Sequence, residues 1–257
     1  MKKNGYNDYF MAGAALIAAA ALVLTIAYLT NRGDLTSATL AMSGIASFVG
    51  GVFLLTLSKG EPFDPGYVGA LPAAGTINLS RVASDLGLMG DGVYLPHQTK
   101  DSPILQFIPA GSYHGATIRE DFSFAMADGS EGLVFLPMGL PLLEQLKHDA
   151  GLRIPAEEAN IFSCIQEVCS DVLEVAEIAA VERSGDAVVV TMGKFRLLSC
   201  CAAVRAESPK CCTMVGCPVC SLVACILTEG FGKPCSLSKA QVDEGHGDLT
   251  LVYSFPE

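Results

Sequence analysis

Cysteines are the residues in this sequence with the greatest capacity for chemistry. All ten lie after residue 163, and eight fall between residues 200 and 235. Within that stretch Cys217-Pro218-Val219-Cys220 forms a CxxC motif, with its proline at the first turn of an expected helix. Unpaired N–H groups and the dipole at a helix start stabilise a thiolate, which is both a nucleophile and a metal ligand. The other six cysteines of the stretch are Cys200, Cys201, Cys211, Cys212, Cys225 and Cys235.

Three interpretations of these cysteines remain open. In the first, Cys217 and Cys220 join upstream cysteines, with Cys211 and Cys212 as candidates and Cys200 or Cys201 as substitutes, in a four-thiolate site for zinc. In the second, the CxxC motif is a redox dithiol. In the third, the cysteines are small buried packing residues in a reducing compartment.

Two features of the surrounding sequence bear on this choice. Four basic residues precede the motif and are expected to lower thiol pKa values: Lys194, Arg196, Arg205 and Lys210. Only 37 residues follow Cys220, which excludes a thioredoxin-type fold, where the motif lies near the beginning. Cys164 and Cys169 fall on the core face of an expected helix and are interpreted as packing residues.

Other chemical signals are weak. The four histidines, His97, His114, His148 and His246, have no metal-ligand spacing, and His246 between two glycines is typical of a hairpin turn. Gly87, Gly90 and Gly92 lack the residues of a phosphate loop, and no Ser-His-Asp set is evident. After Lys59 the chain holds 12 basic and 25 acidic residues, a net charge of −13 that excludes nucleic acid as an expected partner.

Two apolar runs near the N-terminus predict a membrane anchor, residues 1–58. The uncharged runs of 23 and 24 residues favour transmembrane helices over about 10–30 and 35–58, since about 20 apolar residues cross a bilayer core. A signal peptide has a shorter apolar region and is not followed directly by a second span. Ser43, Ser47 and Gly51, facing Ala14 and Ala18, form either a close helix seam or a chance pattern of small residues.

The few charges near the anchor predict its orientation. Lys2, Lys3 and Lys59 flank the two helices at one side, whereas Arg32 lies in the turn between them. The positive-inside rule therefore places both ends in the cytoplasm. The expected location is the cell membrane, multi-pass, with the soluble domain in the cytoplasm and the lipid bilayer as one partner.

After the anchor, a Pro/Gly-rich linker over 59–75 leads to a soluble domain over 76–257. Its pattern predicts an α+β fold, with a mostly antiparallel sheet and about four helices. The expected helices cover 76–86, 141–150, 155–172 and 218–229. The expected strands cover 93–96, 104–109, 122–126, 133–136, 174–182, 187–192, 234–242 and 249–254. The second and third helices begin at prolines, and Ile161, Ile165, Val168 and Val172 form a core stripe.

Three stretches of the chain carry a resemblance to a known family. They are Leu86-Gly87 with GDGVYLP over 90–96, GLVFLPMG over 132–139, and the start of the last helix over 218–224. With them the chain resembles an uncharacterised archaeal family with a membrane hairpin followed by a domain of unknown function. These glycine, proline and core positions imply a shared fold and assign no catalytic residue.

The last forty residues are distantly similar to the end of the 4-vinyl reductase domain. A helix over 219–230 ends in glycine and leads to a strand, a Gly247-Asp248 turn and a final strand. That resemblance implies a small-molecule sensing and adaptor module. The module often has cysteines beside its Gly-Asp turn, where this chain has Val242 and Leu251.

The leading functional prediction is a membrane-anchored cytoplasmic sensing or protein-interaction module that is not an enzyme. Its partner would be a protein or a small ligand, and its cysteines would supply a structural metal site. The alternative is a thiol-dependent redox enzyme that uses Cys217 and Cys220.

Overall fold

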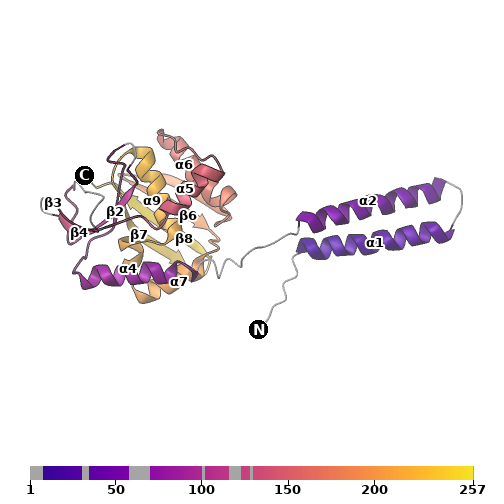
Figure 1. Ribbon diagram of the computed structural model, residues 1–257, viewed down its shortest axis with the longest axis horizontal. Helices are drawn as coiled ribbons and strands as arrows, with labels where there is room; N and C mark the ends of the chain where they lie inside the picture. The colour runs from indigo at the N-terminus through magenta and orange to yellow at the C-terminus, as the bar shows by residue number, and fades with distance from the viewer. Residues whose placement is uncertain are drawn as a thin grey trace. The chain divides into compact units, whose positions relative to one another are not determined.

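A computed structural model describes residues 8–30, 35–57, 70–99, 102–115, 123–127 and 130–256. The chain divides into two compact units, Met1–Asp64 and Pro65–Glu257 (Figure 1). The turn predicted between the apolar helices and most of the predicted linker lie outside the described residues. The two units are considered separately below.

The first unit is a pair of apolar helices, α1 (Asp8–Thr30) and α2 (Leu35–Leu57). They pack through small residues, because a side chain added at Gly44 would overlap Leu24 and one added at Gly51 would overlap Ile17. Of the predicted stripe, Gly51 lies in the contact between the helices, whereas Ala14, Ala18 and Ser43 are exposed. Glycine, with no side chain, lets the backbones approach most closely, so the seam follows Gly13, Gly44 and Gly51.

Three helical segments of the described chain are long and apolar enough to cross a bilayer: Phe10–Thr30, Thr36–Thr56 and Lys210–Phe231. The first two have only 11% of their residues buried, whereas the third is 89% buried inside the second unit. The exposed pair weakly supports membrane association of the first unit. The third segment is a core element.

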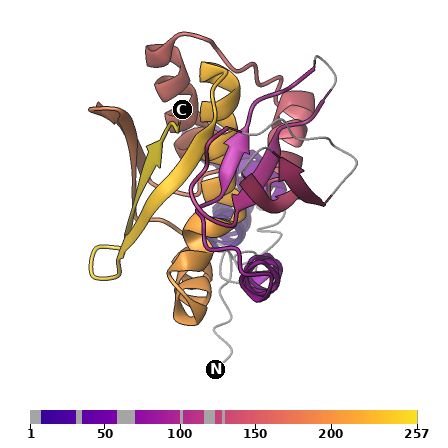
Figure 2. The ribbon, with the colours of Figure 1, turned by 90° about the vertical axis from the view of Figure 1, so that its left-hand side faces the viewer.

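The second unit is built on an eight-stranded sheet with the order β3-β4-β2-β1-β7-β8-β6-β5, in which every neighbouring pair is antiparallel (Figure 2). This confirms the predicted α+β class. The strands are β1 (Val93–Leu95), β2 (Leu105–Pro109), β3 (Phe124–Ala127), β4 (Ser130–Phe135), β5 (Ile178–Ser184), β6 (Ala187–Gly193), β7 (Cys235–Asp243) and β8 (Asp248–Ser254).

The two halves of the sheet meet at a short junction. β1 pairs with β7 over only two residue pairs, Val93 with Ser236 and Tyr94 with Cys235. The hydroxyl of Ser236 also donates to the carbonyl of Gly92, with an O–O distance of 3.1 Å. By contrast, β7 and β8 pair over seven positions and contain an irregularity between Leu237 and Lys239.

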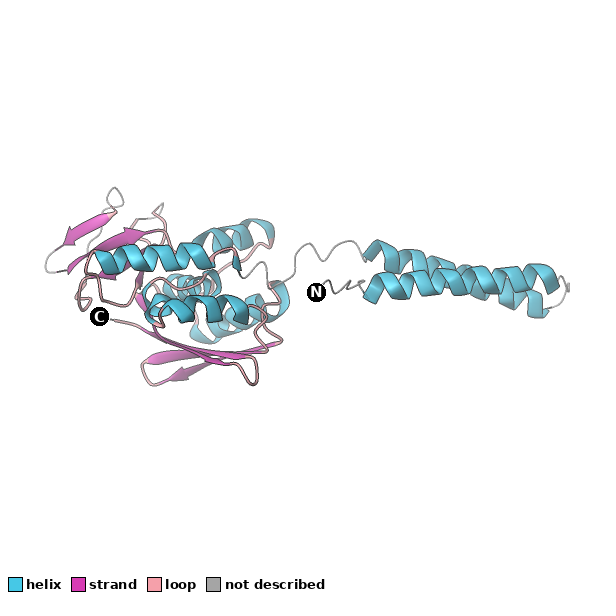
Figure 3. Cartoon of the chain, turned by 90° about the horizontal axis from the view of Figure 1, so that it is seen from below, coloured by secondary structure: helices cyan, strands magenta, loops and turns pink. Residues whose placement is uncertain are grey.

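The helices of this unit outnumber the predicted four. The described part contains six α-helices and one π-helical turn, shown in cyan in Figure 3. They are α4 (Ala73–Asp85), α5 (Leu140–Asp149), α6 (Glu158–Glu167), the π-helical turn η1 (Val168–Val172), α7 (Leu198–Glu207), α8 (Lys210–Met214) and α9 (Pro218–Phe231). The unpredicted helices α7 and α8 occupy the cysteine-dense stretch, where buried cysteines provide no clear amphipathic period.

The helix α9 forms the centre of the core. Ten of its residues are buried, and it packs against β1 and β7 on one side and α5 and α6 on the other. Its sequence is apolar all round, which is the pattern of a helix enclosed by other elements. It ends at Gly232, whose positive φ of 61° suits glycine.

Leu79, Val82 and Leu86 are spaced to share one face of the helix α4, and the sequence predicts that this face is buried, but the structure buries a different one. Its buried residues are Ala73, Thr76, Ser80 and Ala83, whereas Val82 and Leu86 are exposed. Small side chains allow α4 to approach α7 and α8 closely, and Thr76 donates from its hydroxyl to the carbonyl of Gly216 at 3.3 Å. The close packing of small residues therefore determines which face of α4 is buried, although the hydrophobic pattern favours another face.

Candidate functional site: a buried thiol pair

The start of α9 is formed locally by its own sequence. Cys217 occupies the position before the helix with an extended backbone (φ −79°, ψ 166°), and Pro218 is the first helical residue. Proline has its φ preset for a helix and lacks the N–H that would be unpaired there. Cys220 then lies one turn into the helix, so the CxxC spacing places both sulfurs at the same end of α9.

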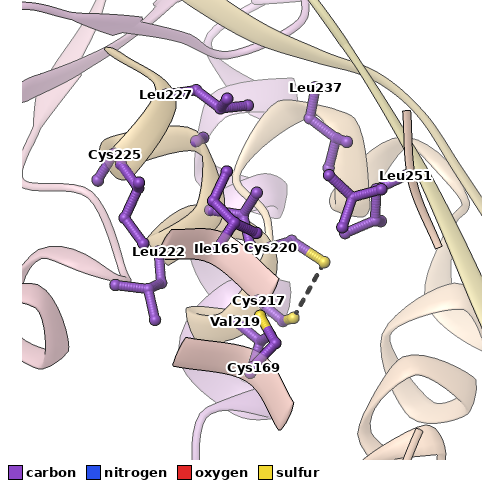
Figure 4. Packing of buried hydrophobic residues seen from close by; sticks show 14 of the residues in the cluster. Ile165, Cys169, Cys217, Val219, Cys220, Leu222, Cys225, Leu227, Leu237 and Leu251 are labelled. Atoms are coloured by element: carbon purple, nitrogen blue, oxygen red, sulfur yellow. Dashed lines mark hydrogen bonds between the residues drawn. The ribbon is translucent and has the colours of Figure 1, made fainter. Parts of the chain in front are cut away.

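The two thiols of this motif lie together in the core. The sulfurs of Cys217 and Cys220 are hydrogen-bonded at a distance of 3.4 Å (Figure 4). The two residues are only 8% and 4% exposed. All ten cysteines are free thiols, and all are buried. The structure therefore brings together the two cysteines that the sequence singled out, in reduced form.

The pKa of Cys217 is well below the usual value for a thiol. The thiols of Cys201 and Cys220 hydrogen-bond to its sulfur and favour its thiolate, and these effects outweigh burial. The N–H groups of Cys220 and Val219 act in the same direction through the dipole of the helix start. The pKa of Cys220 is raised instead, first by its hydrogen bond to Cys217 and then by burial. The hydrogen bonds around the pair thus favour the thiolate on Cys217 and the proton on Cys220.

Further thiols from α7 and α8 surround Cys217. Burial raises the pKa of Cys200 to about 12 and that of Cys212 to about 11, and a charge on Cys217 contributes to both shifts. The pKa of Cys201 is raised mainly by its hydrogen bond to Cys217. The site therefore contains one low-pKa sulfur among neutral thiols.

Two side chains fix the loop that precedes Cys217. The hydroxyl of Tyr94 donates to the carbonyl of Val215 at 3.3 Å, and Gln106 donates through Nε2 to the same oxygen at 2.9 Å. Gln106 also donates to Met214 at 3.2 Å. Gly216 has a φ of +79°, which glycine alone adopts without strain, and a side chain there would meet the Tyr94 hydroxyl at 3.1 Å.

The first turn of α9 is fixed in the same way. The Tyr253 hydroxyl donates to the carbonyl of Cys220 at 2.8 Å, and the hydroxyl of Ser221 accepts the N–H of Gly139 at 2.9 Å. Gly139 is required by this approach, because a side chain there would lie 2.1 Å from the nitrogen of Leu222. The three stretches that carry the family resemblance thus meet here, through Tyr94, Gly139 and the start of α9.

The basic residues upstream of the motif do not have their predicted role. Lys194 pairs with Glu177, Arg196 with Glu174 and Lys210 with Asp91. Only Arg205 acts on a thiol, by opposing the rise in the pKa of Cys212. Because acidic residues are in excess in this domain, three of these four basic side chains pair with carboxylates and not with thiols.

The predicted zinc ligands are partly assembled. A charge on Cys217 helps to raise the pKa of Cys212, whereas the carbonyl of Cys211 accepts the N–H groups of Val215 and Gly216 at 3.1 Å each. Among the described residues, no three Cys, His, Asp or Glu side chains are arranged to hold a metal ion. A tetrahedral zinc site needs four ligands. The zinc site remains a prediction.

Several remaining sequence signals have structural roles. His246 lies in the turn between β7 and β8, where its Nδ1 is 2.8 Å from a carboxylate oxygen of Asp243. Cys164 and Cys169 are buried in the core, as predicted for packing residues. Tyr94, Gln106 and Tyr253 donate hydrogen bonds to backbone carbonyls beside the thiol pair. They were not identified from sequence, because each is more than 30 residues away from the carbonyl it binds.

The fold and site define a class: an α+β domain with a buried thiol pair at a helix start, preceded in the chain by two long apolar helices. A family model described as Domain of unknown function (DUF7982) matches residues 7–255, and the chain belongs to this family. No curated protein and no solved structure matches the chain.

Proposed function

We propose that this protein is a membrane-anchored sensing module whose sensor element is the Cys217–Cys220 dithiol. The observation that carries the proposal is the 3.4 Å sulfur pair at the start of α9, with a low-pKa Cys217 beside a protonated Cys220. A thiolate next to a neutral thiol is the combination needed to form a disulfide in two steps.

A hydroperoxide provides the simplest balanced reaction. The Cys217 thiolate attacks one peroxide oxygen, the O–O bond breaks, and Cys217 becomes a sulfenic acid with release of hydroxide. The Cys220 sulfur then displaces the hydroxyl group and its proton leaves in the water formed. The two sulfurs lose two electrons in total, and the peroxide is reduced to water and hydroxide.

Burial favours a sensor over a redox enzyme. An enzyme that exchanges disulfides with other proteins must present its attacking sulfur to them, whereas Cys217 and Cys220 are nearly inaccessible. A peroxide is small enough to reach a buried thiol during local opening of the structure. Tyr253 is hydrogen-bonded to the Cys220 carbonyl, and Tyr94 is hydrogen-bonded to the loop before Cys217. A new disulfide would therefore alter the contacts of both tyrosines.

The location follows from the apolar helices and the charge pattern. α1 and α2 would anchor the chain in the cell membrane as two spans, with Lys2, Lys3 and Lys59 on the cytoplasmic side. A cytoplasmic domain would explain why ten cysteines are suited to remain reduced. The resemblance of the last forty residues to the 4-vinyl reductase domain would fit a sensor, and the net negative charge disfavours nucleic acid as a partner.

The test uses the full chain, purified without oxygen in detergent and titrated with hydrogen peroxide. Free thiols are then alkylated in denaturant and the disulfides are mapped by mass spectrometry. We expect one reversible disulfide, between Cys217 and Cys220, at peroxide levels that leave Cys164 and Cys169 reduced. The variant C164S is the matched control and should behave as the wild type.

Two results would contradict the proposal. One metal ion per chain, released on C217S substitution, would identify the thiols as a metal site. Absence of the disulfide, with C217S and C220S as stable as C164S, would identify them as packing residues. Elemental analysis and denaturant unfolding of the same preparations distinguish these two outcomes.

A further inference from the structure

A cleft lies between the end of α5, the loop that follows it, and α6. Its volume is about 350 Å³, within the range of small-molecule sites. Its walls come from the α5 end with Leu146 and Ala150, from the loop with Leu152 and Arg153, and from the face of α6 that carries Cys164 and Glu167. Neither Cys217 nor Cys220 lines this cleft, so it is separate from the dithiol.

The π-helical turn forms one side of this cleft and explains an incorrect sequence prediction. An α-helix would place Val172 on the same face as Val168, which is buried in the core. The N–H of Leu173 instead bonds to the carbonyl of Val168 at 2.9 Å, a five-residue π spacing. The wider turn moves Val172 out of the core to line the cleft, where 44% of the residue is exposed. Such turns often occur at functional sites.

Arg153, which lines the cleft, has no ion-pair partner within the described part of this acidic domain. Ten of the basic residues after Lys59 are described, and six of them form ion pairs with Asp or Glu. Within the described structure Arg153 forms no ion pair or hydrogen bond, although acidic residues outnumber basic ones by 25 to 12 in this part of the chain. A free guanidinium on a concave surface is suited to bind a carboxylate with two hydrogen bonds.

The α6 residues that line the cleft include the complementary charge. Glu167 lines the cleft from α6 and, within the described structure, has no ion-pair or hydrogen-bond partner. The carboxyl end of α5 also borders the cleft, with Ala150 as its last capping residue and Gly151 turning the chain at a φ of +65°. A helix carboxyl end favours a cation, as does a free carboxylate. Leu152 and Val172 add apolar surface to the same cleft.

We propose that this cleft binds a small zwitterion, an α-amino acid with a short apolar side chain. Arg153 binds its carboxylate, Glu167 and the end of α5 bind its ammonium group, and Leu152 and Val172 contact its side chain. The assignment goes beyond the proposed function, because it adds a ligand site that needs neither the dithiol nor its oxidation.

The test measures binding to the full chain in detergent with the twenty amino acids and their deaminated carboxylates as probes. Thermal denaturation screens the panel, and calorimetry measures affinity for any compound that raises the melting temperature. We expect one or a few small apolar amino acids to bind. R153A should weaken binding about tenfold or more, the effect of one lost charge-assisted pair.

The second variant separates the two charges. E167Q should weaken binding of the amino acid about tenfold while leaving the weaker binding of its deaminated carboxylate unchanged. The matched controls K239A and E182Q change exposed charges outside the cleft and should bind as the wild type does. If R153A is unstable, R153K serves in its place and should show intermediate affinity.

Three results would overturn the assignment. The first is a panel in which no amino acid stabilises the wild type. The second is equal binding of an amino acid to wild type and R153A. The third is a deaminated carboxylate that binds the wild type as tightly as the amino acid, which would show that Glu167 does not bind an ammonium group.

Discussion

Two regions of this molecule have nearly the same hydropathy and opposite environments. Thr36–Thr56, in α2, has a mean hydropathy of 1.9, and Lys210–Phe231 has 2.0, yet only 11% of the first and 89% of the second is buried. The first is an unbroken helix that packs on α1. The second is interrupted at Val215–Cys217 and enclosed by the sheet and other helices. Apolar composition thus indicates only that a segment is removed from water. The breaks in its helix and the elements that pack against it indicate whether the rest of the protein surrounds it.

The largest expected effect comes from shortening a side chain in each region. Leu222 in α9 is 0% exposed, and L222A should reduce the free energy of unfolding by about 2–5 kcal/mol. L29A, at a residue of α1 that is 74% exposed, should change it by less than about 0.5 kcal/mol. Denaturant unfolding of the full chain in detergent, followed by circular dichroism, measures both. Equal losses in the two variants would show that the regions are not energetically distinct.

A second pair of variants should have effects of opposite sign. G216A introduces a side chain where φ is +79° and Tyr94 is in contact, and should destabilise the second unit by about 1–2 kcal/mol. G50A lies inside α2 with nothing near the added carbon, and should favour the helix by about 1 kcal/mol. The same unfolding measurement, with helix content recorded in detergent, provides the comparison. A neutral G216A would show that the interruption before α9 is not a constraint.

The smallest expected effect concerns pH. The thiolate fraction of an ordinary thiol decreases about tenfold for each pH unit below its pKa. Because the thiolate is the reactive form, the rate of oxidation decreases by the same factor. The lowered pKa of Cys217 should keep a larger fraction of its thiolate than an ordinary thiol keeps as pH falls from 8 to 6. The rate of Cys217–Cys220 disulfide formation with peroxide should therefore decrease by less than about tenfold per pH unit over this range. A tenfold decrease per unit would show that Cys217 behaves as an ordinary thiol.

Local sequence signals predicted much of the fold. Prolines at helix starts, alternating strands and the Ser184-Gly185-Asp186 turn correspond to α5, α9 and the β5–β6 hairpin. The face of α4 and the position of Val172 were predicted incorrectly. Close packing of Thr76 and Ala83 determined the first, and one π spacing determined the second. Neither depends on hydrophobic periodicity, so periodicity could not reveal them.

The candidate site was predictable only in part for a similar reason. Cys217 and Cys220 were identified because a CxxC motif and a proline lie within four residues. Tyr94 and Gln106 hold a loop more than 100 residues away, and nothing in their own surroundings indicates that contact. Pairing of distant residues is a property of the topology, which the sequence pattern did not determine.

The strand order also has a consequence for how the chain is made. β7 and β8 lie between β1 and β6 in the sheet, although they are synthesised after both. Until residue 243 has been added, β1 has an unpaired edge and the apolar α9 has no β7 to cover it, and until residue 254 has been added, β6 has an unpaired edge. Unpaired edges of this kind promote aggregation of incomplete chains. The period between synthesis of β6 and of β8 is therefore when the nascent protein most needs a chaperone.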